Sequence, residues 1–298
     1  MDKIISKLDD SYKILSNESL SKYTTYKVGG IAKYIIYPAS IDKLVELVKL
    51  LRDNNIKFKV IGNGSNLIFS SKEYDGVIIK LNHLNNVIYE DNIVTVEAGY
   101  SAIKLALETA NMGLKGLEFA SGIPGAIGGL TYMNAGAYLS EMSKIVDEVT
   151  VLDKDNNVIT LKNKDMGFSY RHSICPEKGY IVLKVKLILE HGNKEDILAL
   201  IEDRKRRRIE SQPLEYPSAG SVFRNPEGLY SGKLIEDLGL KGYSIGGASV
   251  SIKHANFIIN ENNATAEDIR KLILYVKQRV KEEYGIDLIC EQEFVNWE

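Results

Sequence analysis

A serine that directly follows a glycine, on a segment bounded by two prolines, is the residue of this sequence best placed to do chemistry. Ser221 follows Gly220, and Pro217 and Pro226 bias the backbone around it away from helix. Gly220 leaves room for a close approach, so we expect the hydroxyl to be presented rather than buried. No G-x-S-x-G motif surrounds Ser221, and no histidine lies near it in sequence. A serine without a nearby base indicates a proton donor or a ligand contact, although an ordinary Ser/Gly/Pro loop fits equally well.

An arginine and a glutamate elsewhere could stabilise a developing negative charge. Arg171 lies in a polar, aromatic stretch at residues 168–173, and a guanidinium group can hold a carboxylate or an oxyanion. A surface ion pair is the commoner role of such a residue. Glu291 lies in the last apolar segment, where period-two alternation places it on the face opposite Cys290 and Gln292. It is either an exposed acid at a sheet edge or a half-buried acid whose charge state matters.

Two glycine-rich loops could bind phosphate groups. The first loop (residues 62–66, GNGSN) follows a predicted strand, and its backbone N–H groups could converge on an anion. It is not a Rossmann fingerprint, because the third glycine is missing and no helix obviously follows. The second loop (residues 122–129, GIPGAIGG) leads into a short helix predicted to begin near Gly125. A plain turn and a tight helix–strand crossing are the alternatives, but two such loops together favour a bound dinucleotide.

The composition excludes several classes of protein. The chain has 298 residues, 44% hydrophobic and 26% charged, with a net charge of −2, which gives no overall attraction to nucleic acid or anionic membrane. No apolar run reaches the length of a membrane span, and the acidic N-terminus is not a signal peptide. Two cysteines without metal-type spacing indicate a reducing compartment and no metal site, so we expect a cytoplasmic protein. The basic run at residues 204–208 is expected to be a solvated helix face; phosphate or nucleic-acid binding is the alternative.

The elements that must position these residues alternate between helix and strand, which predicts an α+β or α/β class with at least two lobes. Ser40 is predicted to cap a helix, and Thr265 and Asp268 to form a capping box. The lobe boundary is expected near residues 192–212. Helices are expected at residues 2–15, 40–51, 101–110, 194–210, 231–238 and from 265, and strands at 34–37, 58–61, 77–81, 87–89, 93–98, 145–152, 158–161, 180–189, 248–252, 256–260 and 287–295.

Taken together, these motifs resemble the UDP-N-acetylenolpyruvoylglucosamine reductase family, in its shorter type that lacks an extra tyrosine-bearing loop. The matching segments run in the family's order over nearly the whole chain. They are residues 23–30, 62–67, 122–129, 134–138, 170–173, 216–226 and 246–248.

The resemblance implies an α+β fold: a two-subdomain FAD-binding domain of the vanillyl-alcohol oxidase (PCMH) type and a C-terminal α+β substrate-binding domain. The expected division is an N-terminal helical segment at residues 1–24, an FAD domain at 25–192 split near residue 75, and a substrate domain at 205–298. The last strand is expected to return to the active site. The family implies non-covalent FAD, NADPH as co-substrate, no metal, and a monomer or weak oligomer.

The family reaction reduces the enolpyruvyl ether of UDP-N-acetylglucosamine to UDP-N-acetylmuramate, a step of peptidoglycan precursor synthesis and so of cell-wall growth, cell shape and division. The resemblance implies that hydride passes from flavin N5 to C3 of the substrate. It implies that Ser221 donates a proton to C2, and that Arg171 and Glu291 stabilise the enolate between these steps. Substrate contacts are expected at Tyr170, Arg224, Lys233 and Asn260. The cofactor is expected at Thr25, Val28, Gly29, Gly62, Asn63, Gly64, Ser65, Asn66, Gly122, Ile123, Pro124, Gly125, Gly128, Gly129, Asn134, Gly136 and Ala137.

Two cysteines depart from the family pattern. Cys175 stands where a larger side chain is expected, and Cys290 precedes Glu291, where proline is common. One hypothesis is that Cys175 makes the enzyme sensitive to oxidants. The competing functions are a related FAD oxidase or dehydrogenase acting on another substrate, and a non-catalytic nucleotide- or RNA-binding module that uses residues 204–208.

Overall fold

The computed structural model describes residues 1–298. The chain forms two compact units. The chain passes from unit 1 to unit 2 for the last time within helix α6 (Lys194–Ser211), inside the range 192–212 that was expected for the lobe boundary. Residues 25–33 and 63–74, which were expected in the FAD domain, belong to unit 2 in this division. Unit 1 comprises Met1–Ser16, Tyr34–Gly62 and Asp75–Arg206, and unit 2 comprises Asn17–Lys33, Asn63–Tyr74 and Arg207–Glu298.

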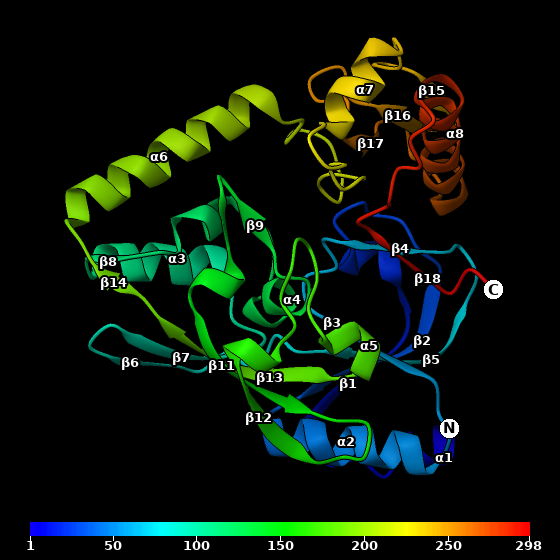
Figure 1. Ribbon diagram of the computed structural model, residues 1–298. Coiled ribbons are helices and arrows are strands. Elements are labelled where there is room, and N and C mark those ends of the chain that lie inside the picture. The colour runs from blue at the N-terminus through cyan, green and yellow to red at the C-terminus, as the bar shows by residue number, and fades with distance from the viewer. The chain divides into compact units, whose positions relative to one another are not determined.

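Unit 1 contains a five-stranded antiparallel sheet in the order β12-β11-β13-β7-β6 (Figure 1). In β13 (Ile181–Ile188) the apolar Leu183, Val185 and Leu187 are buried, whereas Lys184 is exposed. This alternation is typical of a sheet that has one face covered. Helix α4 (Ile127–Tyr132) packs against β13. The other strands are β6 (Val87–Glu90), β7 (Ile93–Glu97), β11 (Val146–Leu152) and β12 (Val158–Lys162), and helix α3 spans Ala102–Asn111.

A second, four-stranded sheet has the order β1-β2-β5-β3. Strands β3 (Phe58–Ile61) and β5 (Tyr74–Lys80) are parallel, and Ile61 is paired with Lys80 at their ends. The first glycine-rich loop therefore begins beside the last residue of β5. Strand β2 spans Ile31–Pro38, and helix α2 spans Ile41–Asp53.

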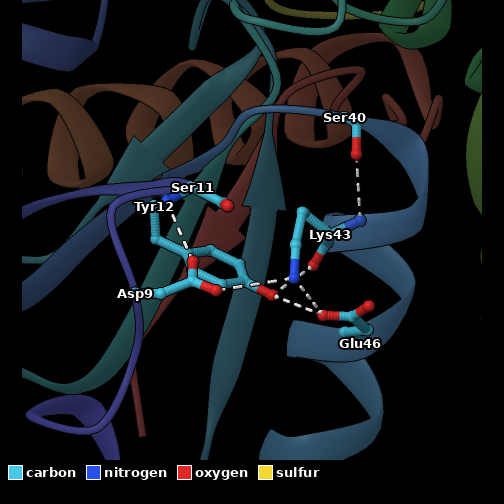
Figure 2. A network of polar contacts seen from close by, with 6 residues as sticks. All are labelled: Asp9, Ser11, Tyr12, Ser40, Lys43 and Glu46. Atoms are coloured by element: carbon cyan, nitrogen blue, oxygen red, sulfur yellow. Dashed lines mark hydrogen bonds and ion pairs between the residues drawn. The ribbon is translucent and has the colours of Figure 1, made fainter.

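The N-terminal residues are held against α2 by the polar network of Figure 2. Ser40 caps α2 as predicted, accepting from the backbone N–H of Lys43 at 3.2 Å. The hydroxyl of Tyr12 donates to the carbonyl of Lys43 at 3.1 Å, and the Lys43 ammonium lies 2.8 Å from the Glu46 carboxylate and 3.6 Å from that of Asp9. Burial and the charge of Glu46 raise the pKa of Tyr12 to about 12.

The helix predicted over residues 2–15 is wrong. Helix α1 covers only Asp2–Ile5, and β1 (Tyr12–Ser19) follows. The apolar spacing of Ile5 and Tyr12 suits a helix, but both side chains join the core of unit 1 from different elements. Tertiary packing therefore overrides the local pattern.

Unit 2 is built on a three-stranded antiparallel sheet, β15 (Ser244–Ile245), β16 (Ala248–Val250) and β17 (Ile258–Asn260), with helix α8 (Ala266–Tyr284) packed on it (Figure 1). The predicted capping box of Thr265 and Asp268 is present. The strand predicted over 287–295 is shorter: only β18 (Glu293–Val295) is regular, and it pairs in parallel with β4 (Leu67–Phe69). Helix α7 spans Ser231–Asp237.

The remaining elements are short. No helix of the chain combines the length and the apolar character needed to cross a bilayer. The short elements are β8 (Leu114–Lys115) paired with β14 (Glu190–His191), β9 (Gly136–Ala137) paired with β10 (Ser140–Glu141), α5 (Cys175–Lys178), and 3-10 turns at Leu20–Tyr23, Glu118–Gly122, Met142–Lys144 and Asn163–Asp165.

Candidate functional site

Ser221 and Glu291 lie on neighbouring extended segments of unit 2. The backbone N–H of Glu291 donates to the carbonyl of Val222 at 2.8 Å, and Phe223 forms an isolated antiparallel bridge with Cys290. Both predicted catalytic side chains are half-buried. The fold thus brings together the segments of two residues that are 70 positions apart in the sequence.

The opposite edge of the serine segment is held by Asn256 and Phe257. Ser221 forms an isolated bridge with Phe257, and the buried side chain of Asn256 accepts from the N–H of Phe223 at 3.0 Å and donates to its carbonyl at 2.8 Å. Gly220 has a φ of +73°, and a Cβ built there meets nothing within 4 Å. The backbone conformation therefore favours glycine here, and no protein atom fills the space that a side chain would occupy.

Gln292 joins the two segments through its buried side chain, a supporting role that the sequence analysis did not predict. Its side-chain amide donates to the carbonyl of Ala219 at 3.1 Å and, more weakly, to that of Ser221 at 3.4 Å. Its oxygen accepts from the hydroxyl of Tyr26 at 3.1 Å. The available signal was its place on the same strand face as Leu288 and Cys290, since an amide on an apolar face is expected to be buried and then requires hydrogen-bond partners.

Arg171 lies at a tight turn in unit 1. Ser169 and His172 exchange backbone hydrogen bonds at 3.2 and 3.0 Å, and Arg171 between them has a φ of +55°. Such a left-handed conformation costs a non-glycine residue about 1 kcal/mol or more and persists where the surroundings enforce it. The guanidinium donates to the carbonyl of Gly136 at 2.7 Å and lies 5.0 Å from the centre of the Tyr170 ring.

Asn134 anchors this turn. Its side chain is fully buried; the amide donates to the carbonyl of Ser169 at 2.9 Å and to the carboxylate of Glu141 at 3.0 Å. The amide oxygen accepts from the N–H of Ser143 at 2.9 Å. Asn134 was predicted as a cofactor residue; its side chain is committed to these protein contacts, so any contact with a cofactor would use its backbone.

The two glycine-rich loops meet within unit 1. A Cβ built on Gly62 would lie 3.3 Å from the Cβ of Ala126, so the first loop starts against the second. Gly129 is exposed, and a Cβ built there meets nothing within 4 Å, which leaves an open surface at this point of α4. The helix begins at Ile127, two residues after the predicted start at Gly125.

In unit 2 the rest of the first loop lies beside Thr25. The N–H of Thr25 donates to the carbonyl of Gly64 at 3.3 Å, and the Thr25 hydroxyl is buried without a hydrogen-bond partner. Gly64 has a φ of +66°, and a Cβ there would lie 2.0 Å from the carbonyl oxygen of Tyr23. An orphaned buried hydroxyl beside a glycine-only loop fits a site that receives a polar ligand such as a dinucleotide.

The other predicted cofactor residues lie on or beside the same segments. Asn66 donates its amide to the carbonyl of Glu291 at 3.1 Å, which connects the first loop to the predicted catalytic glutamate within unit 2. Val28 and Gly29 lie in the irregular segment before β2, and Asn63 and Ser65 lie in the first loop; all four are in unit 2. The others belong to unit 1: Gly122, Ile123, Pro124, Gly125, Gly128, Gly136 and Ala137.

The predicted substrate residues of unit 2 differ in their surroundings. The Nε of Arg224 is buried without a partner, while its backbone N–H donates to the carbonyl of Ile289 at 2.9 Å. Lys233 is exposed and paired with Asp237 on α7, which raises its pKa. Asn260 donates its amide to the carbonyl of Tyr26 at 3.0 Å.

The basic run lies on α6, where Lys205 and Arg206 pair with Glu202 and Asp203 at 3.4 and 2.6 Å. Arg204 lies over the ring of Tyr138 at 4.8 Å. These pairs along one helix support the interpretation of a solvated face over that of a nucleic-acid patch.

Comparisons with known proteins indicate one family along nearly the whole chain. Residues 212–295 match the family model "UDP-N-acetylenolpyruvoylglucosamine reductase, C-terminal domain", and residues 32–162 match "FAD binding domain". The UDP-N-acetylenolpyruvoylglucosamine reductase of Caldanaerobacter subterraneus is 50% identical over 95% of this chain and 94% of its own. That of Clostridium novyi is 42% identical over 100% of this chain and 97% of its own.

Solved structures give the same result. The reductase from Thermus caldophilus superposes with a TM-score of 0.80 at 34% identity, covering 95% of this chain and 98% of its own. Phl p 4.0202, a glucose dehydrogenase, matches 64% of this chain and 44% of its own with a TM-score of 0.51 at 16% identity, a likeness of fold alone. The predicted class, a PCMH-type FAD domain followed by a C-terminal α+β domain, is confirmed.

Proposed function

The chain belongs to the UDP-N-acetylenolpyruvoylglucosamine reductase family, and from this premise we propose how its own residues carry out the reaction. It is an FAD-dependent oxidoreductase of peptidoglycan precursor synthesis that uses NADPH. Bound FAD supplies hydride transfer from NADPH to the methylene carbon, C3, of the enolpyruvyl group. The protein must then supply a proton at C2 and stabilise the negative charge that develops there and on the carboxylate.

Ser221 is the proposed proton donor. One observation carries this assignment: the hydrogen bond from Glu291 to Val222 sets the two segments side by side, so that a half-buried hydroxyl and a half-buried carboxyl group share one region of unit 2. A hydroxyl held on a segment fixed at both edges can deliver a proton to one defined face of a substrate. Glu291 either keeps its own proton or orients a donor.

Arg171 is the proposed stabiliser of the enolate charge. A guanidinium held in advance near a developing oxyanion lowers the barrier without reorganising during the reaction. The strained turn and the hydrogen bond to Gly136 support this role, because they restrict Arg171 to one conformation. Tyr170 beside it, and Arg224, Lys233 and Asn260 in unit 2, are the proposed substrate contacts; the unpartnered Nε of Arg224 makes it the best supported of these.

The proposed FAD site consists of the two glycine-rich loops, with Thr25, Val28 and Gly29 beside the first and Asn134, Gly136 and Ala137 after the second. Support comes from the contact of Gly62 with Ala126, the open surface at Gly129 and the orphaned hydroxyl of Thr25. Backbone N–H groups of the loops would face the diphosphate.

Single-turnover kinetics test these assignments. In Ser221→Ala, flavin reduction by NADPH should keep nearly its wild-type rate, while flavin reoxidation by the enolpyruvyl substrate should slow at least a hundredfold. Ser218→Ala, a half-buried serine of the same segment, is the matched control and should leave both half-reactions unchanged. Equal losses in both half-reactions of Ser221→Ala would contradict its assignment as the proton donor.

A further inference from the structure

A buried lysine outside the predicted site supports the first glycine-rich loop. Lys80 is the last residue of β5 and is only 5% exposed. Its ammonium group donates to the carbonyl of Gly62, the first residue of the loop. The parallel pairing of Ile61 with Lys80 determines this arrangement, since β3 leads into the loop directly beside the end of β5.

We propose that Lys80 is part of the FAD site: its ammonium group fixes the carbonyl of Gly62 and places a positive charge behind the loop that receives the diphosphate. The inference rests on the proposed role of the first loop. Because the carbonyl oxygen of Gly62 is bonded to Lys80, that oxygen is held at a fixed position at the start of the loop.

The location of the charge supports this role. A lysine is rarely buried unless an anion or several polar groups compensate its charge. Burial lowers the pKa of Lys80 to about 8, so most of the side chains are still charged at neutral pH. An FAD diphosphate beside the loop would stabilise that charge, and Lys80 would in turn strengthen cofactor binding. Gly62 also lies against Ala126 of the second loop, so the carbonyl held by Lys80 lies where both loops meet.

The test is FAD release from the holoenzyme, followed by flavin fluorescence on dilution at several salt concentrations. Lys80→Met should raise the Kd for FAD at least tenfold and make it less sensitive to salt, because one cation near the diphosphate is lost. Lys80→Arg keeps the charge and should stay within about threefold of wild type. Lys184→Met removes the same charge from an exposed position of β13 and should change neither the Kd nor its salt dependence.

Two results would overturn the inference. One is a Lys80→Met protein with lower thermal stability but wild-type Kd and salt dependence, because Lys80 would then be only a structural residue. The other is equal loss of affinity in Lys80→Arg and Lys80→Met. Gly64→Ala separates this inference from the loop assignment. If Gly64→Ala weakens FAD binding and Lys80→Met does not, only the role of Lys80 fails; if Gly64→Ala binds FAD normally, the proposed loop site fails.

Discussion

The hydroxyl of Tyr26 donates to the side-chain oxygen of Gln292 at 3.1 Å, and both side chains are almost completely buried. This hydrogen bond links an early segment of unit 2 to its last extended segment. The amide of Gln292 continues the link to the carbonyl of Ala219, two residues before Ser221. The proposed proton donor and Glu291 therefore share one buried polar support.

Removing this support should destabilise unit 2. Gln292→Leu leaves the Tyr26 hydroxyl and the carbonyl of Ala219 unpaired in the core, at a cost of about 2–4 kcal/mol in the free energy of unfolding. Tyr26→Phe should lower the free energy of unfolding by less than Gln292→Leu does. In the Gln292→Leu background the loss caused by Tyr26→Phe should be smaller still, since the hydroxyl has already lost its partner. Urea unfolding of the four proteins measures the coupling, and strictly additive losses would show that the pair is not coupled.

Asn134→Asp tests the positioning of Arg171. The substitution removes both amide donors and sets a carboxylate against Glu141, so the turn at Ser169 loses its buried anchor. Flavin reoxidation by the enolpyruvyl substrate should slow at least tenfold, with a smaller change in flavin reduction by NADPH. Asn111→Asp, on the exposed end of α3, is the matched control. An unchanged oxidative half-reaction would separate Asn134 from the function of Arg171.

Cys175 should not be the site of oxidant sensitivity. The side chain is fully buried and burial raises the pKa of its thiol, so the reactive thiolate is scarce and inaccessible. We expect Cys175→Ser to be inactivated by peroxide at the wild-type rate, and the thiol to react with a disulfide reagent only after unfolding. Rapid modification of Cys175 in the native protein would contradict this. The structure thus removes the basis of the hypothesis drawn from sequence.

The buried Lys80 should make stability depend on pH. Its pKa falls from 10.5 to about 8 in the folded protein, so between these values the unfolded chain binds more protons than the folded one. The free energy of unfolding of the flavin-free protein should therefore rise with pH across this window, by at most about 3 kcal/mol from this residue. The difference between wild type and Lys80→Met, measured from pH 7 to 9.5, isolates the effect. A difference that does not vary with pH would contradict it.

Thr265→Ala should loosen the first turn of α8. The side chain of Thr265 accepts from the N–H of Asp268 at 3.1 Å, and the Asp268 carboxylate accepts from the N–H of Thr265 at 3.0 Å. Loss of the cap should cost about 1 kcal/mol. Thr265→Ser should retain most of the stability, and thermal unfolding compares the two. Equal midpoints for Thr265→Ala and wild type would show that the cap contributes nothing.

The sequence predicted correctly those elements that depend only on residues a few positions apart. Ser40 caps α2 and Thr265 caps α8, because a cap depends on side chains within one turn of the chain. Strand β3 has the predicted bounds because its short run of strand-forming residues, FKVI, ends at a glycine. The prediction of an N-terminal helix failed because Tyr12 is held by α2 through the carbonyl of Lys43, a partner 31 residues away that no local spacing reveals.

The sequence alone determined the chemistry available to this protein. The ordered motifs around Ser221, Arg171 and the two glycine-rich loops indicate the family, and relatives that match nearly the whole chain show it. Only the tertiary structure decided which segments become neighbours. Three hydrogen bonds between distant segments show this. Glu291 bonds to Val222, and Lys80 bonds to the carbonyl of Gly62. Asn134 bonds to Ser169 and so holds the turn of Arg171. Such pairings depend on strand register and burial, which local sequence does not encode.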